Sequence, residues 1–296
     1  MAGETYSTGT FPVTVSAIEE RAYILQYENT LLPKLFKPIG QGQKGNLIQW
    51  PYFDPTSWAT AASVLTESVD FVTYKNLTNA SKIVQASEFG VISFVSDQAV
   101  EVNTEAIVDI LSKDQGLAVA AGLEAHCVGA ISGAFTGTVN ATNATNGLTY
   151  TAIAAAKAEV DGRMLTVPGE KNLVINEYAY FYTAKSTYAP TYAAAVPNLG
   201  DEVLQKWHIN TVFGDVRIFR DNYISVDASN FCRGAMFVRD AVAIWTPRTY
   251  RLKSQRDESA RGTEYISTMR AGASVLIPGY GINVTCYATA PSGLTF

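Results

Sequence analysis

The clearest hydrophobic pattern in the chain is a helical stripe in its middle third. Asn103 or Thr104 can cap a helix, and small or apolar residues then recur at spacings of three, four or seven. The residues that mark this face are Ile107, Leu111, Ala118, Ala121, Ala125 and Val128. The pattern predicts a helix from about Thr104 to Ile131, roughly 40 Å long at about 1.5 Å per residue. Its many small residues would let a sheet or a second helix approach closely.

A shorter helix is predicted near the amino terminus. Residues 1–15 are rich in Thr, Ser and Gly and predict an extended arm. Ser16 and Glu19 form a capping box, and the helix that follows should end at Pro33. Its apolar positions, expected to hold the arm against the rest of the protein, are Ile18, Ala22 and Leu25.

Two β-rich runs, 46–53 and 82–96, predict a long hairpin with a tip of about two dozen residues. Pro51 confines the first strand to an edge. A two-stranded element alone buries too little surface to be stable in water. We therefore predict that its aromatic side chains dock on another surface as an assembly interface: Trp50, Tyr52, Phe53, Trp58 and Phe71.

The second half of the chain mixes helices and strands, so the fold class is α+β. After a polar loop at 133–147, the pattern predicts a helix near 150–160, a strand near 171–184, a short helix from Asp201 and strands around 208–220. The tail from Ala235 to Cys286 is rich in strands. It predicts a sheet that lies along the central helix.

Composition narrows the functional class. The 296 residues include 27 acidic and 22 basic side chains, for a net charge of −5, whereas a duplex-DNA reader is normally basic. Charged residues make up only 17%, against roughly 25% in a typical soluble domain, which suits a subunit surrounded by other protein. The first residues lack a signal-peptide pattern, and no apolar run approaches about 18 residues. We expect a protein made and used in the cytosol, with no membrane partner.

Candidate chemistry is sparse. Cys127, Cys232 and Cys286 stand far apart, so neither a disulfide framework nor a zinc knuckle is indicated. The run Gly40 to Gly45 fits G-x-G-x-x-G, but a strand follows it where a dinucleotide site needs a helix, which favours a plain connector. We predict no catalytic, cofactor-binding or metal site. The split basic cluster Arg248, Arg251, Lys253 and Arg256 favours a solvated strand pair over phosphate contact.

Two pairs of a histidine and a cysteine are candidates for the base and nucleophile of an enzyme. His126 and Cys127 are consecutive on the predicted central helix, where side chains diverge and cannot act as base and nucleophile. A pair formed across the chain by His208 and Cys232 stays open, as the site of a cytosolic hydrolase. A packed cysteine and an ordinary histidine is the more common outcome.

The order of arm, hairpin, long helix, α/β insert and terminal sheet resembles the major capsid proteins of tailed bacteriophages, with the Hong Kong ninety-seven type of capsid fold. The segments that carry the resemblance are PIGQGQKGNLIQWPYF, KIVQASEFGVISFVSDQAV, EAIVDILSKDQGLAVAAGLEAHCVGAISG, VFGDVRIFRDNYI and RGAMFVRDAVAIW. The resemblance implies an N-arm (1–45), an extended β-hairpin loop (46–100), a peripheral domain made of a spine helix (101–133) and a C-terminal sheet (231–296), and an α/β apical domain (134–230).

The same resemblance implies a structural subunit without a cofactor. It would assemble as hexamers and pentamers into an icosahedral virion capsid that encloses double-stranded DNA without sequence-specific binding. Assembly would take place in the cytoplasm of a bacterial host, with a separate scaffold, a portal and decoration proteins as partners. Some relatives join loop lysines to asparagines covalently, but no motif selects a partner for Lys75 here. An encapsulin-like shell around cargo enzymes is the nearest alternative.

Overall fold

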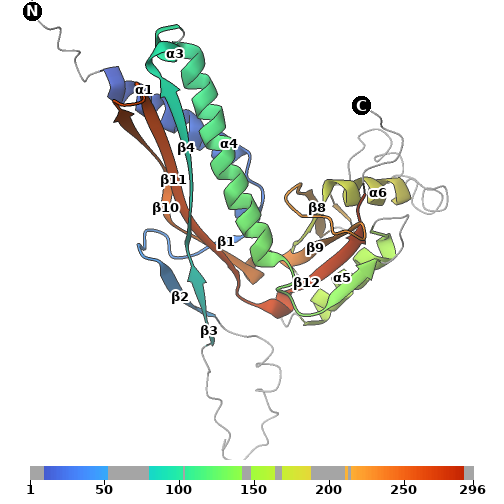
Figure 1. Ribbon diagram of the computed structural model, residues 1–296. Helices are drawn as coiled ribbons and strands as arrows, with labels where there is room; N and C mark the ends of the chain where they lie inside the picture. Colours follow the sequence, from blue (N-terminus) through green and yellow to red (C-terminus); the bar gives the residue numbers. More distant parts are fainter. Residues whose placement is uncertain are drawn as a thin grey trace, which may run out of the picture.

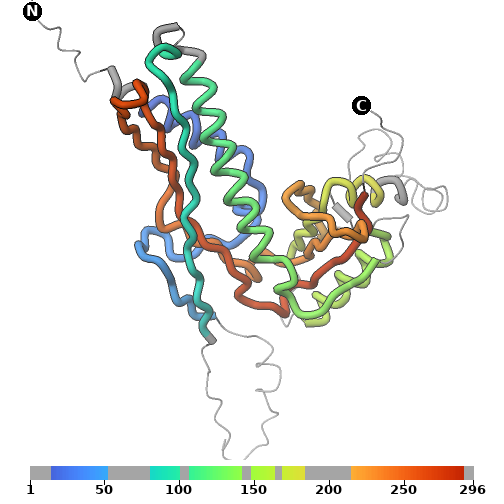
Figure 2. The backbone as a smooth tube through the Cα atoms, in the orientation of Figure 1, coloured from blue at the N-terminus to red at the C-terminus, as the bar shows by residue number. Residues whose placement is uncertain are grey.

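The computed structural model describes residues 10–52, 80–102, 104–141, 148–163, 169–187, 211–212 and 215–289. These residues form a long limb and a smaller lobe set at an angle to it, with a two-stranded hairpin at the foot of the limb (Figure 1). The smooth trace in Figure 2 shows how the chain passes from limb to lobe, returns to the limb, and then enters the lobe again. Both the amino-terminal and the carboxyl-terminal thirds of the chain therefore contribute to the limb.

The limb is a sheet with helices on one of its faces. Its strands run in the order β1 (Lys37–Pro38), β10 (Val242–Asp257), β11 (Gly262–Val275) and β4 (Ser87–Ser96). Helix α4 (Thr104–Ile131) lies along β11 and β4, which confirms the predicted central helix and its bounds. Gln115 ties the layers together, because its Nε2 donates to Ser93 Oγ at 2.6 Å and to the Tyr265 carbonyl at 3.3 Å.

Helix α1 (Thr10–Glu28) packs on both α4 and β10. Ile18 and Ala22 are fully buried there and Leu25 is half-buried, so the described part of this helix packs on its own chain. The helices come closest at Gly116, where an added Cβ would lie 2.7 Å from the Ala22 carbonyl oxygen. On its other side, Glu19 Oε1 accepts a hydrogen bond from the Leu252 amide.

The start of α1 corrects the sequence prediction. The helix begins at Thr10, so residues 10–15 are not extended and Ser16 is not its cap. Val15 packs against the main core, which extends the buried face of the helix by a turn before Ser16. Pro12 is compatible with this start because a proline in the first helical turn removes an amide that would lack a partner anyway.

The foot of the limb is a hairpin of β2 (Leu47–Tyr52) and β3 (Ala80–Gln85). Ile48 and Val84 lie opposite each other and are buried in a small cluster around Trp245. The base of the predicted hairpin is therefore confirmed. Its return strand, expected over 82–96, instead divides at Ala86: β4 pairs with β11 along its whole length.

The lobe is built on a six-stranded sheet. The order is β5 (Thr138–Ala141), β12 (Gly281–Tyr287), β9 (Phe231–Val238), β6 (Lys171–Ile175), β8 (Val216–Arg220) and β7 (Thr211–Val212). Helices α5 (Tyr150–Arg163) and α6 (Glu177–Thr187) pack against it, and β6 is buried at all five positions. Three aromatic rings join lobe to limb, with Phe237 contacting Phe36 edge-on at 5.7 Å and stacking on Phe135 at 5.8 Å.

Two sequence predictions fail in the lobe. The strand expected over 171–184 ends at Ile175, because Asn176 caps α6: its Oδ1 accepts from the Tyr178 amide at 2.9 Å. The tail beyond residue 230 is not one sheet along the central helix, since β10 and β11 lie in the limb while β9 and β12 pair with lobe strands. The strands expected around 208–220 are found in part as β7 and β8, and the helix expected from Asp201 lies outside the described residues.

Short elements complete the chain. Helix α2 (Leu32–Leu35) follows the arm helix, and α3 (Asp97–Val102) connects β4 to α4. Two 3₁₀ turns, Arg239–Ala241 and Pro278–Tyr280, mark where the chain leaves the lobe for the limb and where it returns. The limb hairpin of β10 and β11 is thus an excursion from the lobe sheet.

We predict that Gly116→Ala lowers the free energy of unfolding by about 1–3 kcal/mol, although alanine favours helix by about 1 kcal/mol, because the new methyl meets the backbone of α1. Gly129→Ala in the same helix is the matched control, since nothing lies within 4 Å of its Cβ position. That control should be neutral or stabilising. Urea unfolding of the purified subunit measures both, and an equal effect of the two substitutions would contradict close packing of α1 on α4.

Candidate assembly surfaces

One face of the limb sheet carries exposed apolar side chains. Along β4 the side chains alternate, with Phe89, Val91 and Ser93 turned toward the helices. Ile92 and Phe94 point the other way and are 65% and 48% exposed. Large exposed β-branched and aromatic side chains on a strand face usually mark a surface that another element covers. Among the described residues no helix or second sheet covers these two, although the Phe94 ring lies against Gly262 of the neighbouring strand.

The register extends this surface across neighbouring strands. Ile92 lies opposite Ile266 of β11, and Ile266 lies opposite Lys253 of β10; directly opposed residues of antiparallel strands share a face. In the same way Phe94 shares its face with Glu264. We name this surface the open sheet face, and it comprises Ile92, Phe94, Arg251, Lys253, Glu264, Ile266 and Thr268. It is apolar at β4 and basic at β10.

The strand β4 is also the last strand on its side of the limb sheet. Its ten residues pair with β11 on one side, and no described strand pairs with the other. A long edge strand leaves a row of amides and carbonyls that can pair with another chain. Soluble monomers usually blunt such an edge with lysine or proline, whereas β4 has neither. The unpaired edge and the open sheet face adjoin each other along β4 and together are the candidate assembly surface.

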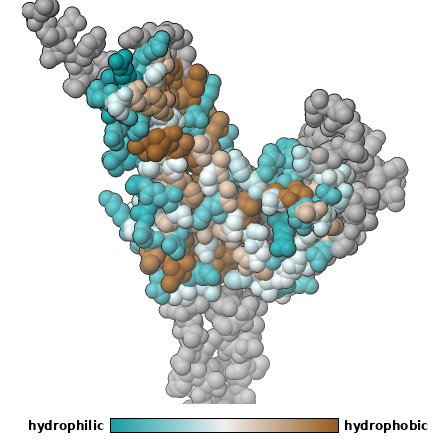
Figure 3. Space-filling model, viewed as in Figure 1, coloured by the Kyte–Doolittle hydropathy of each residue, from teal (hydrophilic) through white to brown (hydrophobic). Residues whose placement is uncertain are grey.

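Further exposed apolar residues lie elsewhere on the limb. Figure 3 shows brown surfaces over β4 and α4 in the upper limb and over the β2–β3 hairpin below. The large apolar side chains exposed there are Tyr23, Ile24 and Tyr27 on α1, Ile110 and Leu117 on α4, and Leu47 and Ile83 on the hairpin. The limb therefore exposes large apolar side chains on its helices and on its hairpin as well as on β4.

The structure places only part of the predicted interface. Trp50 and Tyr52 lie on β2 and are half-buried, and Trp50 packs against the cluster around Trp245 in its own chain. Phe53, Trp58 and Phe71 lie outside the described residues. The sequence prediction missed Ile92 and Phe94, although the nearly continuous apolar run from Phe89 to Val95, with apolar residues at odd and even positions, is a signal for a strand with two apolar faces.

A buried carboxylate joins the central helix to the segment that follows α1. Glu124 of α4 is 2% exposed and accepts hydrogen bonds from the amides of Leu31 and Leu32, the shortest at 2.8 Å, at the start of α2. Burial raises the pKa of Glu124 to about 7, opposed by those amides, while Asp221 of the lobe raises it further and Lys34 lowers it. Burial also raises the pKa of Asp221.

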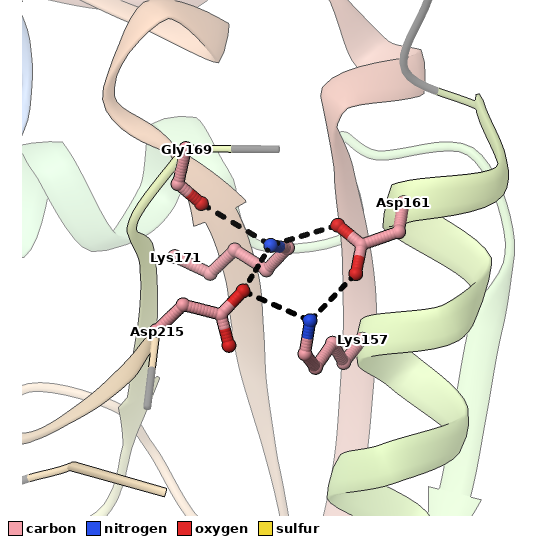
Figure 4. Close-up of polar contacts among 5 residues, drawn as sticks. All are labelled: Lys157, Asp161, Gly169, Lys171 and Asp215. Atoms are coloured by element: carbon pink, nitrogen blue, oxygen red, sulfur yellow. Dashed lines mark hydrogen bonds and ion pairs between the residues drawn. The ribbon is translucent and has the colours of Figure 1, made fainter. Parts of the chain in front are cut away.

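A closed network of charges lies inside the lobe (Figure 4). The fully buried Lys171 Nζ contacts Asp161 at 2.7 Å, Asp215 at 2.8 Å and the Gly169 carbonyl at 3.1 Å. Lys157 contacts the same two carboxylates at 2.7 and 2.9 Å. Burial tends to raise the pKa of Asp215, but the hydrogen bonds from Lys157 and Lys171 outweigh it and lower that pKa. The two positive and two negative charges balance. Because Lys157 and Asp161 lie on α5, Lys171 on β6 and Asp215 just before β8, the network fastens the helix to these strands.

The enzyme candidates find little geometric support. Cys127 faces the core, and burial raises the pKa of its thiol, which disfavours the nucleophilic thiolate. The adjacent His126 points to the other side, with its ring 5.3 Å from that of Phe89. Cys232 is buried and His208 lies outside the described residues. Within the described ranges no cluster of three metal-ligating side chains occurs, and no helix there is long and apolar enough to span a membrane.

The glycine-rich connector and the basic cluster have structural roles. Gly40 adopts φ +56°, and a Cβ there would lie 2.4 Å from Ile48 and 3.2 Å from Trp245, so glycine is needed to fold the connector over the foot cluster. In the basic cluster, Arg256 donates to both oxygens of Asp97 at 3.0 and 2.9 Å. The connector is packed over the foot cluster and Arg256 is paired with a carboxylate, so neither the connector nor this arginine is arranged to bind a phosphate.

Comparison with known proteins decides the family. The family model described as phage capsid protein matches residues 79–282, more than two thirds of the chain. This chain belongs to the phage capsid protein family. No curated protein sequence matches the chain. The matched region contains the open sheet face, α4, and the lobe strands up to β12.

Solved structures show the fold of this capsid protein. A chain of Mycobacterium phage Che8 matches with a TM-score of 0.63 at 14% identity, over 86% of this chain and 90% of that one. The capsid of the cyanophage P-SCSP1u gives 0.63 at 14% identity, over 88% and 89%. A virus-like particle from Pyrococcus furiosus gives 0.62 at 11% identity, over 91% and 98%. The fold is the Hong Kong ninety-seven type, as expected, and the protein is a structural major capsid protein of a bacteriophage, a subunit of the virion shell.

We predict that Lys171→Met lowers the free energy of unfolding by about 3–5 kcal/mol, because Asp161 and Asp215 would face each other with a single cation between them. Lys113→Met on α4 is the control, since it removes an exposed ion pair to Asp109 that contributes about 0.5 kcal/mol or less. Urea unfolding of both purified variants tests this. Equal losses would mean that the buried network contributes no more than a surface pair.

Glu124 predicts a pH dependence of stability. Its folded pKa of about 7 lies above its ordinary value of 4.5, so the folded capsid protein binds more protons between these values and loses stability as pH rises from 4.5 to 7. The loss should be roughly 2–3 kcal/mol. Glu124→Gln keeps an acceptor for the Leu31 and Leu32 amides and should flatten the profile. Unfolding free energies measured from pH 4.5 to 8 check this; equal slopes in both proteins would contradict it.

Proposed function

We propose that this capsid protein forms hexamers and pentamers that close into an icosahedral shell around double-stranded DNA. Family membership supports the shell, and the observation that supports a permanent contact between copies is the open sheet face with its unpaired edge strand β4. Shell assembly would occur in the cytoplasm of the bacterial host. We propose a separate scaffold, a portal and decoration proteins as its partners.

A second copy of the chain is the proposed occupant of the open sheet face. Closed rings use heterologous contacts, in which one surface meets a different surface of the next copy. The base of the β2–β3 hairpin offers such a surface, because Leu47 and Ile83 are exposed on the side away from the Trp245 cluster. We further propose that the sequence-predicted loop residues Phe53, Trp58 and Phe71 extend this contact. Trp50 and Tyr52 lie on the opposite face of β2, where Trp50 packs on the Trp245 cluster of its own chain. Permanent interfaces of this kind bury more than about 2,000 Å² in total.

We propose that the hairpin, the limb and the lobe correspond to the three structural units that the family resemblance implies. The hairpin of β2 and β3, with the residues between them, is the proposed extended loop, since β4 pairs into the limb. The limb with α1 and α4 is the proposed peripheral domain. The lobe, which includes β9 and β12, is the proposed apical domain.

The charge of the subunit suits a container better than a DNA-binding protein. With 27 acidic and 22 basic residues, the subunit carries a net charge of −5 and repels phosphates overall. The one basic strip on the open sheet face, Arg251 and Lys253, lies beside apolar residues rather than beside stacking aromatics. We propose that DNA is enclosed rather than held by specific contacts. Particles that lack a nucleic-acid absorbance peak at 260 nm would instead favour the cargo-enclosing nanocompartment.

We predict that Ile92→Lys combined with Phe94→Lys leaves a folded subunit that forms no shells. Both side chains are exposed in the subunit, so the fold should tolerate the change, whereas two lysines on an edge strand oppose pairing with another chain. Electron microscopy and size-exclusion chromatography of the expressed protein measure assembly. Circular dichroism checks that the fold is retained.

The matched control is Ala155→Lys with Ala158→Lys on α5. These positions are exposed, and the first lysine faces Glu159 four residues on, which a helix accommodates well. This variant adds the same charge to the lobe and should assemble normally. Normal particles from the Ile92 and Phe94 variant would remove the open sheet face from the proposed interface.

A further inference from the structure

Two of the three cysteines lie against each other across neighbouring strands of the lobe. Cys232 of β9 and Cys286 of β12 are directly opposed in the antiparallel register. Both are fully buried, and their sulfur atoms are 3.3 Å apart. All three thiols of the protein are free. Nothing in the proposed shell contacts uses this pair.

Their positions meet the geometric requirement for a disulfide. A disulfide needs Cα atoms about 4.4–6.8 Å apart, and directly opposed residues of antiparallel strands are about 4.5–5.5 Å apart. Side chains of such a pair also leave the sheet on the same face. The bond could therefore form with little backbone movement. The third cysteine, Cys127, lies on α4 in the limb and pairs with neither.

We propose that Cys232 and Cys286 are a site of oxidative modification, forming an intramolecular disulfide when the capsid protein meets a low-molecular-weight disulfide such as oxidised glutathione. One thiolate attacks a sulfur of the oxidant and releases one molecule of reduced thiol. The second thiolate attacks the mixed disulfide and releases the other. Two protons leave the cysteines, and their two electrons reduce the oxidant to two thiols.

The surroundings of the pair favour Cys232 as the attacking thiol. A hydrogen bond with the Cys286 thiol lowers the pKa of Cys232, and the Asn176 backbone contributes in the same direction, while burial opposes both. The sulfur that is the better thiolate is the one that begins the exchange. Aromatic contacts flank the site, with the Tyr287 ring 5.9 Å from Phe231 and 5.4 Å from Tyr182. Oxidation therefore requires a local opening of this end of the sheet.

The bond would close a ring that contains β10 and β11, two of the three strands of the open sheet face. The two cysteines are 54 positions apart, and the chain between them forms β10 and β11 before it returns to the lobe. A crosslink at the base of this excursion restricts the unfolded chain and stabilises the folded one. The proposed function enters only through the environment, because a virion that is released from its host leaves the reducing cytosol and meets oxidising conditions. The bond itself depends on the fold alone.

Thiol counting by mass spectrometry tests the proposal on the unassembled subunit and on particles separately. Protein reduced with dithiothreitol, then denatured and treated with N-ethylmaleimide, should take three labels, one for each cysteine. Protein first oxidised with glutathione disulfide should take one label, on Cys127, with a peptide that joins Cys232 to Cys286. Its unfolding temperature should rise by about 5 °C or more.

Cys286→Ser is the matched variant, because it removes one thiol and keeps the other buried. It should take two labels after reduction, show no internal crosslink after oxidation, and show no rise in unfolding temperature. Three labels on the oxidised wild-type protein, even after incubation just below its unfolding temperature, would overturn the proposal. So would a crosslink that uses Cys127. Either result leaves shell assembly untouched, so failure here is distinguishable from failure of the proposed function.

Discussion

In the described part of the chain, helices cover one face of the limb sheet and leave the other open, and the rest of the molecule depends on this constraint. Helices α1 and α4 bury one side of β10, β11 and β4, while Ile92 and Phe94 face outward on the other. A sheet with exposed apolar side chains on its outer face and an unpaired edge is unfavourable for a solitary soluble protein. It is a suitable design for a subunit whose second layer comes from another copy.

The contacts that join limb to lobe fix how that surface is presented. The Phe36 ring contacts the Phe237 ring of the lobe edge-on at 5.7 Å, and Phe135 stacks on Phe237 at 5.8 Å. The chain crosses this joint repeatedly, since β9 and β12 belong to the lobe and the strands between them to the limb. The relative setting of the two parts is therefore defined by many short-range contacts. A shell requires this, because small changes in subunit shape alter the curvature of the whole.

Local patterns predicted the central helix well and long-range pairing poorly. The helix from Thr104 to Ile131 follows from periodicity alone, and so does the base of the hairpin. The partner of β4 and the division of the tail between two sheets depend on contacts between residues far apart in sequence, which periodicity does not encode. The strand expected over 171–184 failed because a single side chain, Asn176, starts a helix there. Glu124 and the opposed cysteines carry no local signal at all.

The most direct test of the account is a structure of the particles that the expressed protein forms, determined by electron cryomicroscopy. The account predicts closed icosahedral shells in which a neighbouring copy lies on Ile92 and Phe94 and along the edge of β4. Shells in which this surface faces solvent, or a protein that stays monomeric at assembly concentrations, would contradict it.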